Sequence, residues 1–196
     1  MQGGDPLSCP SPSRLATVAL LLATACSSGP QRTYTDPSMD FGAIRTVAVL
    51  PFQNLSREQT ANQRVRDVFV TLLLAAEAVY VVPTGETARG LEQAVVANPT
   101  APSIAEVVKL GTILKADAVI TGVVKEYGEI RSGTATSNAV SISIQLQEAG
   151  TGKVVWSGAS TKGGIGFTDR LFGGGGEPLN RVTEEAVRDI LDQLFR

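Results

Sequence analysis

An apolar segment near the start of the chain limits what the mature protein can contain. The run from Leu15 to Ala25 is shorter than the ~20 residues that a membrane-spanning helix needs, and no later apolar run is longer. Arg14 supplies a positive flank, the run has the length of a signal-peptide hydrophobic region, and small residues lead into Cys26. The segment therefore predicts an export signal over residues 1–25.

Cys26 follows directly after the small residues, which is the arrangement of a bacterial lipobox. In a lipobox the cysteine is acylated on sulfur and becomes the new N-terminus, so we predict that Cys26 carries lipid such as palmitate and holds the chain on a membrane. Two features depart from this pattern, because Ala23 stands where Leu is commoner and the leading segment contains Asp5 and Cys9. The alternatives are an ordinary cleaved signal and an amphipathic core helix, and the second needs a polar face that the run lacks.

Composition excludes several classes of function. The 196 residues include no histidine, which removes the commonest general base, the commonest metal ligand and every Ser-His-Asp arrangement. The net charge is −2, and removal of residues 1–25 takes away one acidic and one basic residue, so no basic patch remains for nucleic acid. The acidic residues Glu184, Glu185 and Asp189 fall in a helical pattern and are expected on its solvated face. We therefore expect no enzymatic activity, no cofactor, no metal and no nucleic-acid partner.

The segment after Cys26 differs in character from the rest of the chain. From Ser27 to Met39 it reads SSGPQRTYTDPSM, contains two prolines and has no hydrophobic period, which predicts a flexible tether. No second break in composition follows. We expect the lipidated cysteine and tether over residues 26–41 and a single periplasmic domain over residues 42–196.

The remaining chain alternates short β-rich runs with amphipathic helices. The pattern predicts strands over residues 45–52, 78–83, 116–129, 138–150 and 152–161, and helices over residues 60–78, 84–96, 103–115 and 178–195. The first run, RTVAVLPF, is apolar on both faces, which indicates an interior strand ended by Pro51. The order β-α-β-α-α-β-β-β-α predicts an α/β fold, a mixed sheet of about five strands packed by helices, parallel in its first part and antiparallel in its last.

Finer signals mark individual residues. Ser103 and Glu106 have the spacing of a capping box at a helix start, and Ile104 is among the residues expected to face inward. Trp156 is expected in the core, on the same strand face as Val154. One strand alternates cleanly, which predicts a wet or partner-facing sheet surface formed by four polar residues. These are Ser141, Ser143, Gln145 and Gln147.

The segment Gly163 to Gly176, GGIGFTDRLFGGGG, is the richest in glycine and the first candidate for a binding site. A phosphate-binding loop is disfavoured, because no Lys-Ser/Thr pair follows at P-loop spacing and the third glycine of a dinucleotide-binding turn is missing. Large side chains on a glycine-rich backbone suit contact with a partner protein or a membrane. The candidate partner-binding residues are Phe167, Arg170, Leu171 and Phe172. The alternative is that the apolar ones fold back onto the core.

Three stretches together carry a resemblance to a known group: VAVLPFQNLS, LKADAVITGVVKEYGE and EAGTGKVVWSGAST. They resemble the bacterial lipoprotein superfamily that includes CsgG, LpoB and the N-terminal domain of TolB, and AVYVVPTGETARGLEQ through VVWSGAS is most similar to small neisserial-type outer-membrane lipoproteins. The resemblance covers about residues 45–161. It implies an anticodon-binding-domain-like α/β fold, lipid on Cys26, non-enzymatic assembly or regulatory work and a periplasm-facing position. In that family's usual sorting, Ser27 after the cysteine favours the outer membrane.

The expected function is therefore that of a lipid-anchored, non-enzymatic accessory protein that binds a protein partner in the envelope, with homo-oligomerisation left open. The alternative is a subunit of an oligomeric, CsgG-like secretion channel. A membrane strand needs ~9–11 residues, and a loop expected at Ser132–Ser137 cannot hold a pair of them. The glycine-rich loop has room for at most one hairpin and lacks alternation.

Overall fold

The computed structural model of the chain describes residues 33–132, 135–164 and 176–196. Its helices are α2 (Ala61–Ala75), α3 (Thr84–Ala94), α4 (Ile104–Leu114) and α6 (Leu179–Leu194), with a short 3-10 helix η2 (Phe41–Ala43). Its strands are β1 (Tyr34–Thr35), β2 (Thr46–Val49), β3 (Gln53–Asn54), β4 (Tyr80–Val81), β5 (Ala118–Ser132), β6 (Ala135–Glu148) and β7 (Val154–Gly163). Among these described helices, none has both the length and the apolar character to cross a membrane.

The seven strands form one mixed sheet in the order β1-β7-β6-β5-β2-β4, and β3 pairs with β5 beyond the end of β2. β2 is parallel to both β4 and β5, whereas β6 is antiparallel to both of its neighbours, β5 and β7. The predicted mixed sheet, parallel first and antiparallel last, is confirmed. The five expected strands correspond to β2 and β4–β7, and the two-residue strands β1 and β3 are additions.

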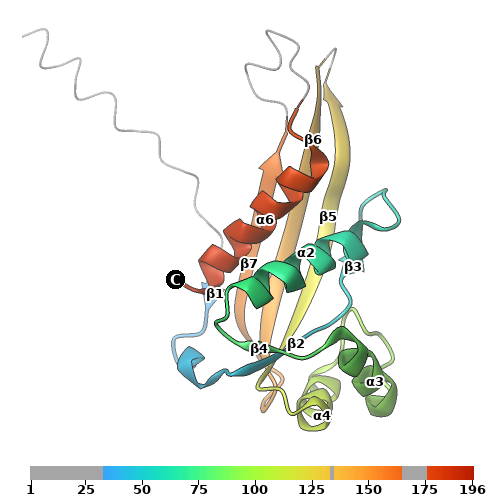
Figure 1. Cartoon of the computed structure of the whole chain (residues 1–196). Helices are drawn as coiled ribbons and strands as arrows, with labels where there is room; N and C mark the ends of the chain where they lie inside the picture. Colours follow the sequence, from blue (N-terminus) through green and yellow to red (C-terminus); the bar gives the residue numbers. More distant parts are fainter. Residues whose placement is uncertain (1–32, 133–134, 165–175) are drawn as a thin grey trace, which may run out of the picture. The chain divides into compact units, whose positions relative to one another are not determined.

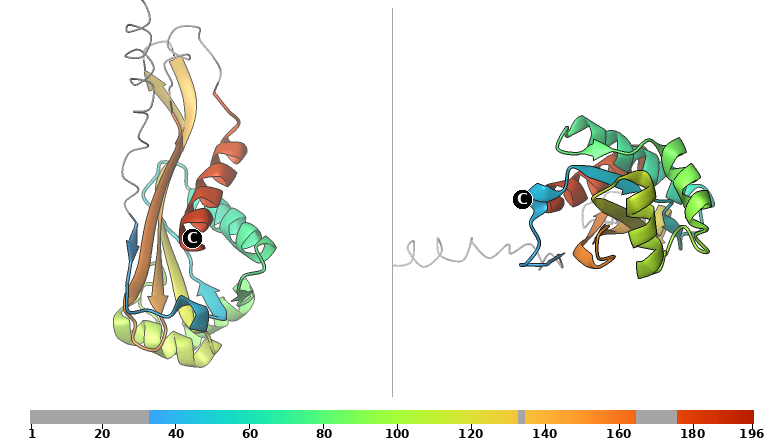
Figure 2. Two further views of the ribbon diagram at one scale, coloured as in Figure 1. Left: turned by 90° about the vertical axis from the view of Figure 1, so that its left-hand side faces the viewer. Right: turned by 90° about the horizontal axis from the view of Figure 1, so that it is seen from below.

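Helices cover the two faces of the sheet unequally. α2 and α6 lie along one face (Figure 1), where their apolar residues join the main core with Ile120, Ile142 and Trp156. α3 and α4 pack at one end of the sheet, against Leu50 and Val119, while the long strands run on past them (Figure 2). Because neighbouring residues of a strand point to opposite faces, Val119 and Ile120 place these two cores on opposite sides.

The end of β2 is held by a side chain that the hydrophobic pattern did not single out. The strand stops before Pro51, as predicted, since proline cannot donate to the ladder. The half-buried Arg66 of α2 donates from Nε to Leu50 O at 2.9 Å and from Nη2 to Val49 O at 2.6 Å. Burial lowers the pKa of this guanidinium. Arg66 therefore satisfies main-chain carbonyls where the strand ladder ends.

The hairpin of β5 and β6 is longer than the sequence indicates. Pairing continues to Ser132 opposite Ala135, so the loop expected at Ser132–Ser137 is wrong. The outer part of the hairpin carries polar and charged side chains rather than an apolar alternation, but ladder hydrogen bonds form between backbone groups whatever the side chains are. The hairpin is therefore long enough that the length of this loop does not exclude a channel subunit.

Part of the expected tether belongs to the folded unit. Tyr34 and Thr35 pair with Ser157 and Trp156 as an edge strand, although residues 26–41 have no hydrophobic period. Farther along the same segment, Met39 and Phe41 pack against the main core. A strand of two residues is too short to show a hydrophobic period, so its pairing with β7 cannot be detected from the sequence pattern.

Two single-residue expectations have different outcomes. Trp156 is buried in the core with 2% of its surface exposed, as predicted. Its expected partner Val154 lies on the opposite face, because a bulge at Val155 inserts one extra residue between them. The capping box of Ser103 and Glu106 is present.

Ile104 was expected to face inward, and this expectation is wrong. As the first residue of α4, it is 64% exposed and lies over the turn at Gly152 instead of the core. Helix periodicity does not place a first-turn side chain reliably, because the cap sets the direction in which the chain enters the helix.

Candidate functional site

The predicted site residues Cys26, Phe167, Arg170, Leu171 and Phe172 lie outside the described residues. The structure describes the residues on either side of the glycine-rich loop and those that follow the expected lipid anchor. Thr33 is the first described residue after the expected lipid anchor, and Gly164 and Gly176 flank the glycine-rich loop. The site is therefore built from these attachment points.

Asn138 of β6 joins the two ends of the glycine-rich loop. Its main-chain oxygen accepts a hydrogen bond from the Gly164 N–H at 2.9 Å. Its side-chain Nδ2 donates to the main-chain oxygen of Glu177 at 2.8 Å. One residue thus brings the start and the end of the loop to the same strand. We call Asn138, Gly163, Gly164, Gly176 and Glu177 the loop stem.

Two glycines are required at the loop stem by close approach. Gly163 has φ +75°, and a Cβ there would collide with the main-chain oxygen of Asn138. A Cβ on Gly176 would collide with Ser137. L side chains rarely adopt the positive φ of Gly163, and a Cβ at either position would clash, so both positions favour glycine for geometric reasons. Part of the glycine richness of this segment is therefore structural.

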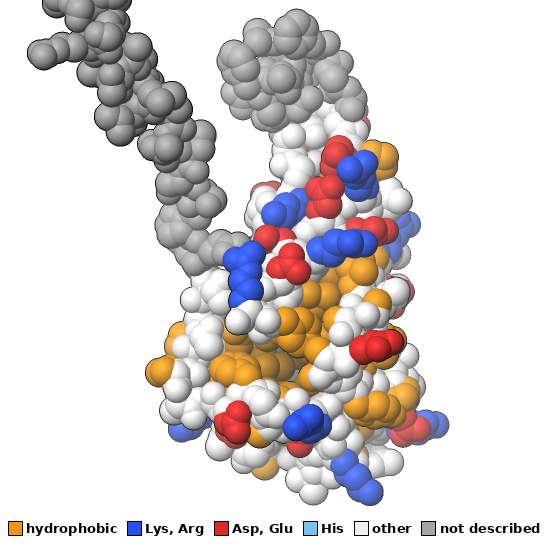
Figure 3. Space-filling view, turned by 60° about the vertical axis from the view of Figure 1, so that its left-hand side comes forward, with side chains coloured by type: hydrophobic (Ala, Val, Ile, Leu, Met, Phe, Trp, Pro, Cys, Tyr) orange, Lys and Arg blue, Asp and Glu red, His pale blue; other side chains and the backbone are white. Residues whose placement is uncertain are grey.

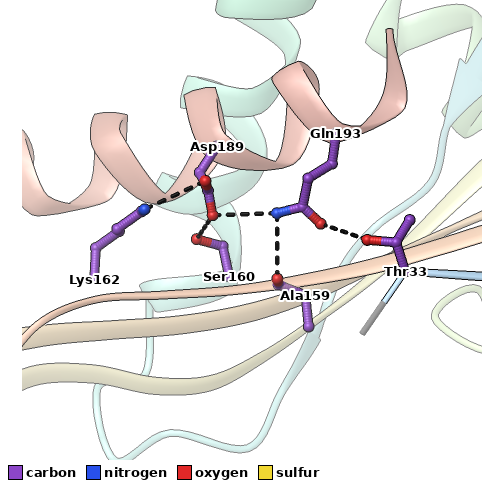
Figure 4. Close-up of polar contacts among 6 residues, drawn as sticks. All are labelled: Thr33, Ala159, Ser160, Lys162, Asp189 and Gln193. Carbon is purple, nitrogen blue, oxygen red and sulfur yellow. Dashed lines mark hydrogen bonds and ion pairs between the residues drawn. The ribbon is translucent and has the colours of Figure 1, made fainter. Parts of the chain in front are cut away.

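A chain of polar contacts ties the start of the folded unit to α6 (Figure 4). Thr33 Oγ1 donates to Gln193 Oε1 at 2.9 Å. Gln193 Nε2 in turn lies 3.2 Å from Asp189 Oδ2 and 3.5 Å from the main-chain oxygen of Ala159. Gln193 is only 8% exposed. Thr33, within the expected tether, is therefore fixed to the last turn of α6.

Asp189 connects the same chain of contacts to β7. Its Oδ2 accepts from Ser160 Oγ at 2.7 Å, and its Oδ1 lies 3.3 Å from Lys162 Nζ. Ser160 is 4% exposed and its hydroxyl donates to the carboxylate, so it is neither open to a substrate nor activated as a nucleophile. We call Thr33, Ser160, Lys162, Asp189 and Gln193 the tether clasp. Its chemistry is that of a structural attachment.

The expectation for the three acidic residues of α6 is right for two of them. Glu184 is exposed and lies 3.9 Å from Arg188, and Glu185 is partly exposed and lies 3.3 Å from Arg181. Asp189 instead faces the sheet, so its expected place on the solvated face is wrong. Helix periodicity could have found this, because Asp189 lies three residues after Ala186 on the buried side.

Hydrophobic side chains also gather in a hollow on one face of the molecule (Figure 3). A pocket of about 70 Å³ lies between the C-terminal ends of α2 and α6 and the sheet. It is lined by Phe41, Ile44, Val47, Leu73, Val79, Ile120, Leu146, Leu194 and Phe195. Ligand sites usually have about 300–1,000 Å³, so this pocket suits one apolar side chain rather than a cofactor. Among the described residues, no group of three or more His, Cys, Asp or Glu side chains is placed to hold a metal.

The sequence matches a family of lipoproteins. Residues 39–170 match the family described as "Putative lipoprotein GNA1162-like", and the chain belongs to this family. The resemblance to small neisserial-type lipoproteins is thereby confirmed. No curated protein matches the sequence.

Solved structures share the fold. Lipoprotein GNA1162 from Neisseria meningitidis is 20% identical with a TM-score of 0.54, over 77% of this chain and 98% of that one. PelC from Paraburkholderia phytofirmans, solved as a dodecamer, is 17% identical with a TM-score of 0.55, over 84% and 96%. Protein CT253 from Chlamydia trachomatis is 13% identical with a TM-score of 0.53, over 78% and 96%. Identities this low establish a common fold and nothing more.

Proposed function

We propose that this chain is a lipid-anchored, non-enzymatic accessory protein of the bacterial envelope, held by lipid on Cys26 to the outer membrane and facing the periplasm. Membership of the lipoprotein family carries this proposal, since the family match begins at residue 39, shortly after the predicted signal and cysteine. The mature chain then consists of the lipidated cysteine, a short tether and one domain.

The tether clasp limits the distance between the domain and the membrane. Thr33 is fixed to Gln193, so at most residues 26–32, rather than residues 26–41, separate the proposed lipid on Cys26 from the first attached residue of the domain. Seven residues span at most about 25 Å when fully extended. The domain therefore works close to the membrane surface, and its partner must be reachable from there.

Partner binding is assigned to the glycine-rich loop, with Phe167, Arg170, Leu171 and Phe172 as the contact residues. The loop stem supports this assignment, because Asn138 holds the two ends of the loop at one strand. Glycines lower the cost of reshaping the backbone around a partner, and aromatic and arginine side chains are the usual anchors of interfaces.

Homo-oligomerisation is a second candidate, favoured by the dodecamer in which PelC was solved. The more specific channel alternative finds little support in the long hairpin. Its outer part carries Glu129 and Arg131, which form an exposed ion pair at 2.8 Å. Strands of a membrane barrel alternate apolar and polar residues, and charges on the lipid face are destabilising.

The lipid anchor is tested by the variant Cys26→Ser. Each acyl methylene buried in a membrane contributes ~0.8 kcal/mol, so loss of the lipid should release the chain. We expect the variant to be soluble or unprocessed and to lose labelling by radioactive palmitate, while Cys9→Ser behaves as the wild type. A Cys26→Ser chain that still labels and still fractionates with outer membranes would refute the anchor.

A further inference from the structure

The outer edge of β5 is open over its second half. β2 pairs with β5 as far as Ile120, and β3 pairs with it as far as Val124, where Leu55 N–H donates to Val124 O at 2.8 Å. Within the described residues, no strand pairs with that side of β5 from Glu126 to Ser132, whereas β6 pairs along the whole opposite side. The backbone groups of this edge are therefore available to an additional strand.

A wide groove of about 900 Å³ lies beside this open edge. One wall is β5 from Lys125 to Arg131, and the other is formed by the loop from Leu55 to Glu58, by Arg64 of α2 and by Leu179 of α6. Leu55 is 61% exposed and Ile130 is 37% exposed, so both offer apolar contact to an incoming chain. We call this region the β5 edge groove.

The charges of the β5 edge groove favour an acidic partner. Its lining contains the cations Arg57, Arg64, Lys125 and Arg131 and the carboxylates Glu58, Glu126 and Glu129. Two of the carboxylates are engaged, Glu129 by Arg131 at 2.8 Å and Glu58 by the Thr60 hydroxyl at 3.0 Å. Within the described part of the chain, no ion pair includes Arg57, Arg64 or Lys125, and all three are exposed. The hydroxyl of Thr60 leaves the charge of Glu58 in place, so the lining as a whole carries four cations and three carboxylates, a net charge of +1.

We propose that the β5 edge groove binds an extended, acidic segment of a partner protein as an additional strand on β5. Side chains of such a strand alternate between the two faces of the sheet. On the helix-covered face, where Tyr127 packs against the core, they meet the cations of the groove; on the open face they meet Ile130. The bulge after Val124 and the charges of the edge disfavour pairing with apolar strands, which restricts the edge to complementary segments.

The inference rests on the proposed function only in assuming a periplasmic protein partner, because it concerns a surface separate from the glycine-rich loop.

Variants of Glu129 test whether the backbone of the β5 edge binds the partner. The carbonyl of Val124 points away from β6, toward Leu55. Backbone groups along a strand point alternately toward and away from a given neighbour, and the bulge at Lys125 shifts this alternation by one residue. The N–H of Glu129 therefore also points away from β6, toward the open edge. Glu129→Pro removes this donor and keeps the pairing with β6, whereas Glu129→Ala removes the carboxylate and keeps the donor.

The experiment selects random peptides of about 12 residues by phage display against the full chain in detergent, then measures their affinity by fluorescence anisotropy. We expect enriched peptides in which acidic residues alternate with apolar ones. Their Kd should rise at least about tenfold in Glu129→Pro and in Arg57→Glu/Arg64→Glu, and change less than about threefold in Glu129→Ala. Binding should weaken as NaCl is raised.

Three outcomes would overturn the proposal. The first is that selection enriches no acidic peptides, and the second is that neither Glu129→Pro nor Arg57→Glu/Arg64→Glu weakens binding. The third is that the wild type self-associates in sedimentation while Glu129→Pro does not, which would make a second copy the occupant. If Glu129→Pro fails to fold, judged by its melting curve, Arg57→Glu/Arg64→Glu decides. The lipid anchor and the glycine-rich loop are tested separately. If peptides still bind after Cys26→Ser and after replacement of the loop, the inference holds even where the proposed lipid anchor or the proposed role of the loop is refuted.

Discussion

At the scale of single residues, Trp156 illustrates how one side chain organises this core. Among the described residues it is the largest fully buried side chain. It lies opposite Leu146 on the neighbouring strand and belongs to the same core as the buried side chains of α6. Gly158 leaves the space that the indole occupies, since a Cβ at that position would meet the ring. A residue this large, closed in on several sides, leaves a cavity when it is truncated.

Trp156→Ala should therefore lower the free energy of unfolding by about 3–5 kcal/mol. Trp156→Phe retains most of the apolar volume and is expected to cost much less. Urea denaturation followed by circular dichroism measures both variants. An unchanged midpoint for Trp156→Ala would contradict the core role of the indole.

Glu106 is a second residue whose role follows from its hydrogen bonds. Its carboxylate accepts from the N–H of Ala97 at 2.8 Å and from the N–H and hydroxyl of Ser103, both at 2.7 Å. These bonds lower the pKa of Glu106, and a bond from Ser38 likewise lowers the pKa of Asp36. A carboxylate with a depressed pKa stabilises the fold above its unfolded pKa and stops doing so as pH falls through the folded value.

Stability should therefore fall as the pH is lowered below about 4.3, the ordinary pKa of a glutamate. In Glu106→Gln this acid-dependent loss should be smaller, because the amide does not titrate, and Asp36 should account for part of the remainder. Denaturant titrations between pH 3 and pH 7 measure the slope. Equal slopes in Glu106→Gln and the wild type would show that the cap does not carry the effect.

At the scale of elements, the long hairpin and α6 hold the glycine-rich loop between them. Asn138 lies on β6, Gly164 follows β7 and Glu177 precedes α6, so three elements meet at the loop stem. The free energy of closing a loop changes only slowly with its length. The loop can therefore vary while the stem keeps its geometry.

Replacement of residues 165–175 by a short Gly-Ser linker should keep the fold and abolish co-purification of the native partner. Retention of Gly163, Gly164 and Gly176 preserves the stem. The double variant Phe167→Ser/Phe172→Ser is a matched variant that keeps the loop length. If the replacement unfolds the domain, the phenylalanines belong to the core; if folding and partner binding both survive, the interface lies elsewhere.

At the scale of the whole molecule, the tether clasp joins the start of the domain to its last helix. Thr33 contacts Gln193, which is buried in the last turn of α6, and the Asp36 N–H donates to Val155 O at 2.8 Å. The start of the described chain is thus attached to α6 through one amide side chain and to β7 through backbone bonds.

Gln193→Leu should loosen the start of the domain. The variant removes the bonds of Gln193 to Thr33, Asp189 and Ala159. The bond to Thr33 alone contributes about 0.5–1.5 kcal/mol, and its loss corresponds to roughly a two- to tenfold faster exchange of the Asp36 amide. Hydrogen exchange measured by mass spectrometry follows this amide, and Asp192→Ala, at an exposed position on the same helix, is the control. Equal exchange of the Asp36 amide in Gln193→Leu and in Asp192→Ala would show that the tether clasp does not attach the tether to the domain.

The sequence by itself determined the class of fold, because periodicity is a local property. The alternation of β6, the helical spacing of α2, and the capping box of Ser103 and Glu106 each depend on residues close together in the chain. Together with motif resemblance they predicted a mixed α/β lipoprotein domain. The candidate residues for lipid and partner also came from the sequence, and they remain predictions.

Only the tertiary structure decided features that join distant residues. The clasp links Thr33 to Gln193 across 160 positions, Asn138 meets Glu177 across 39, and Asp189, whose inward direction helix periodicity allows, finds its partners Ser160 and Lys162 on β7. No local pattern encodes such pairings. The open edge of β5 is likewise invisible in the sequence, because whether a strand is at an edge depends on which other strands lie beside it.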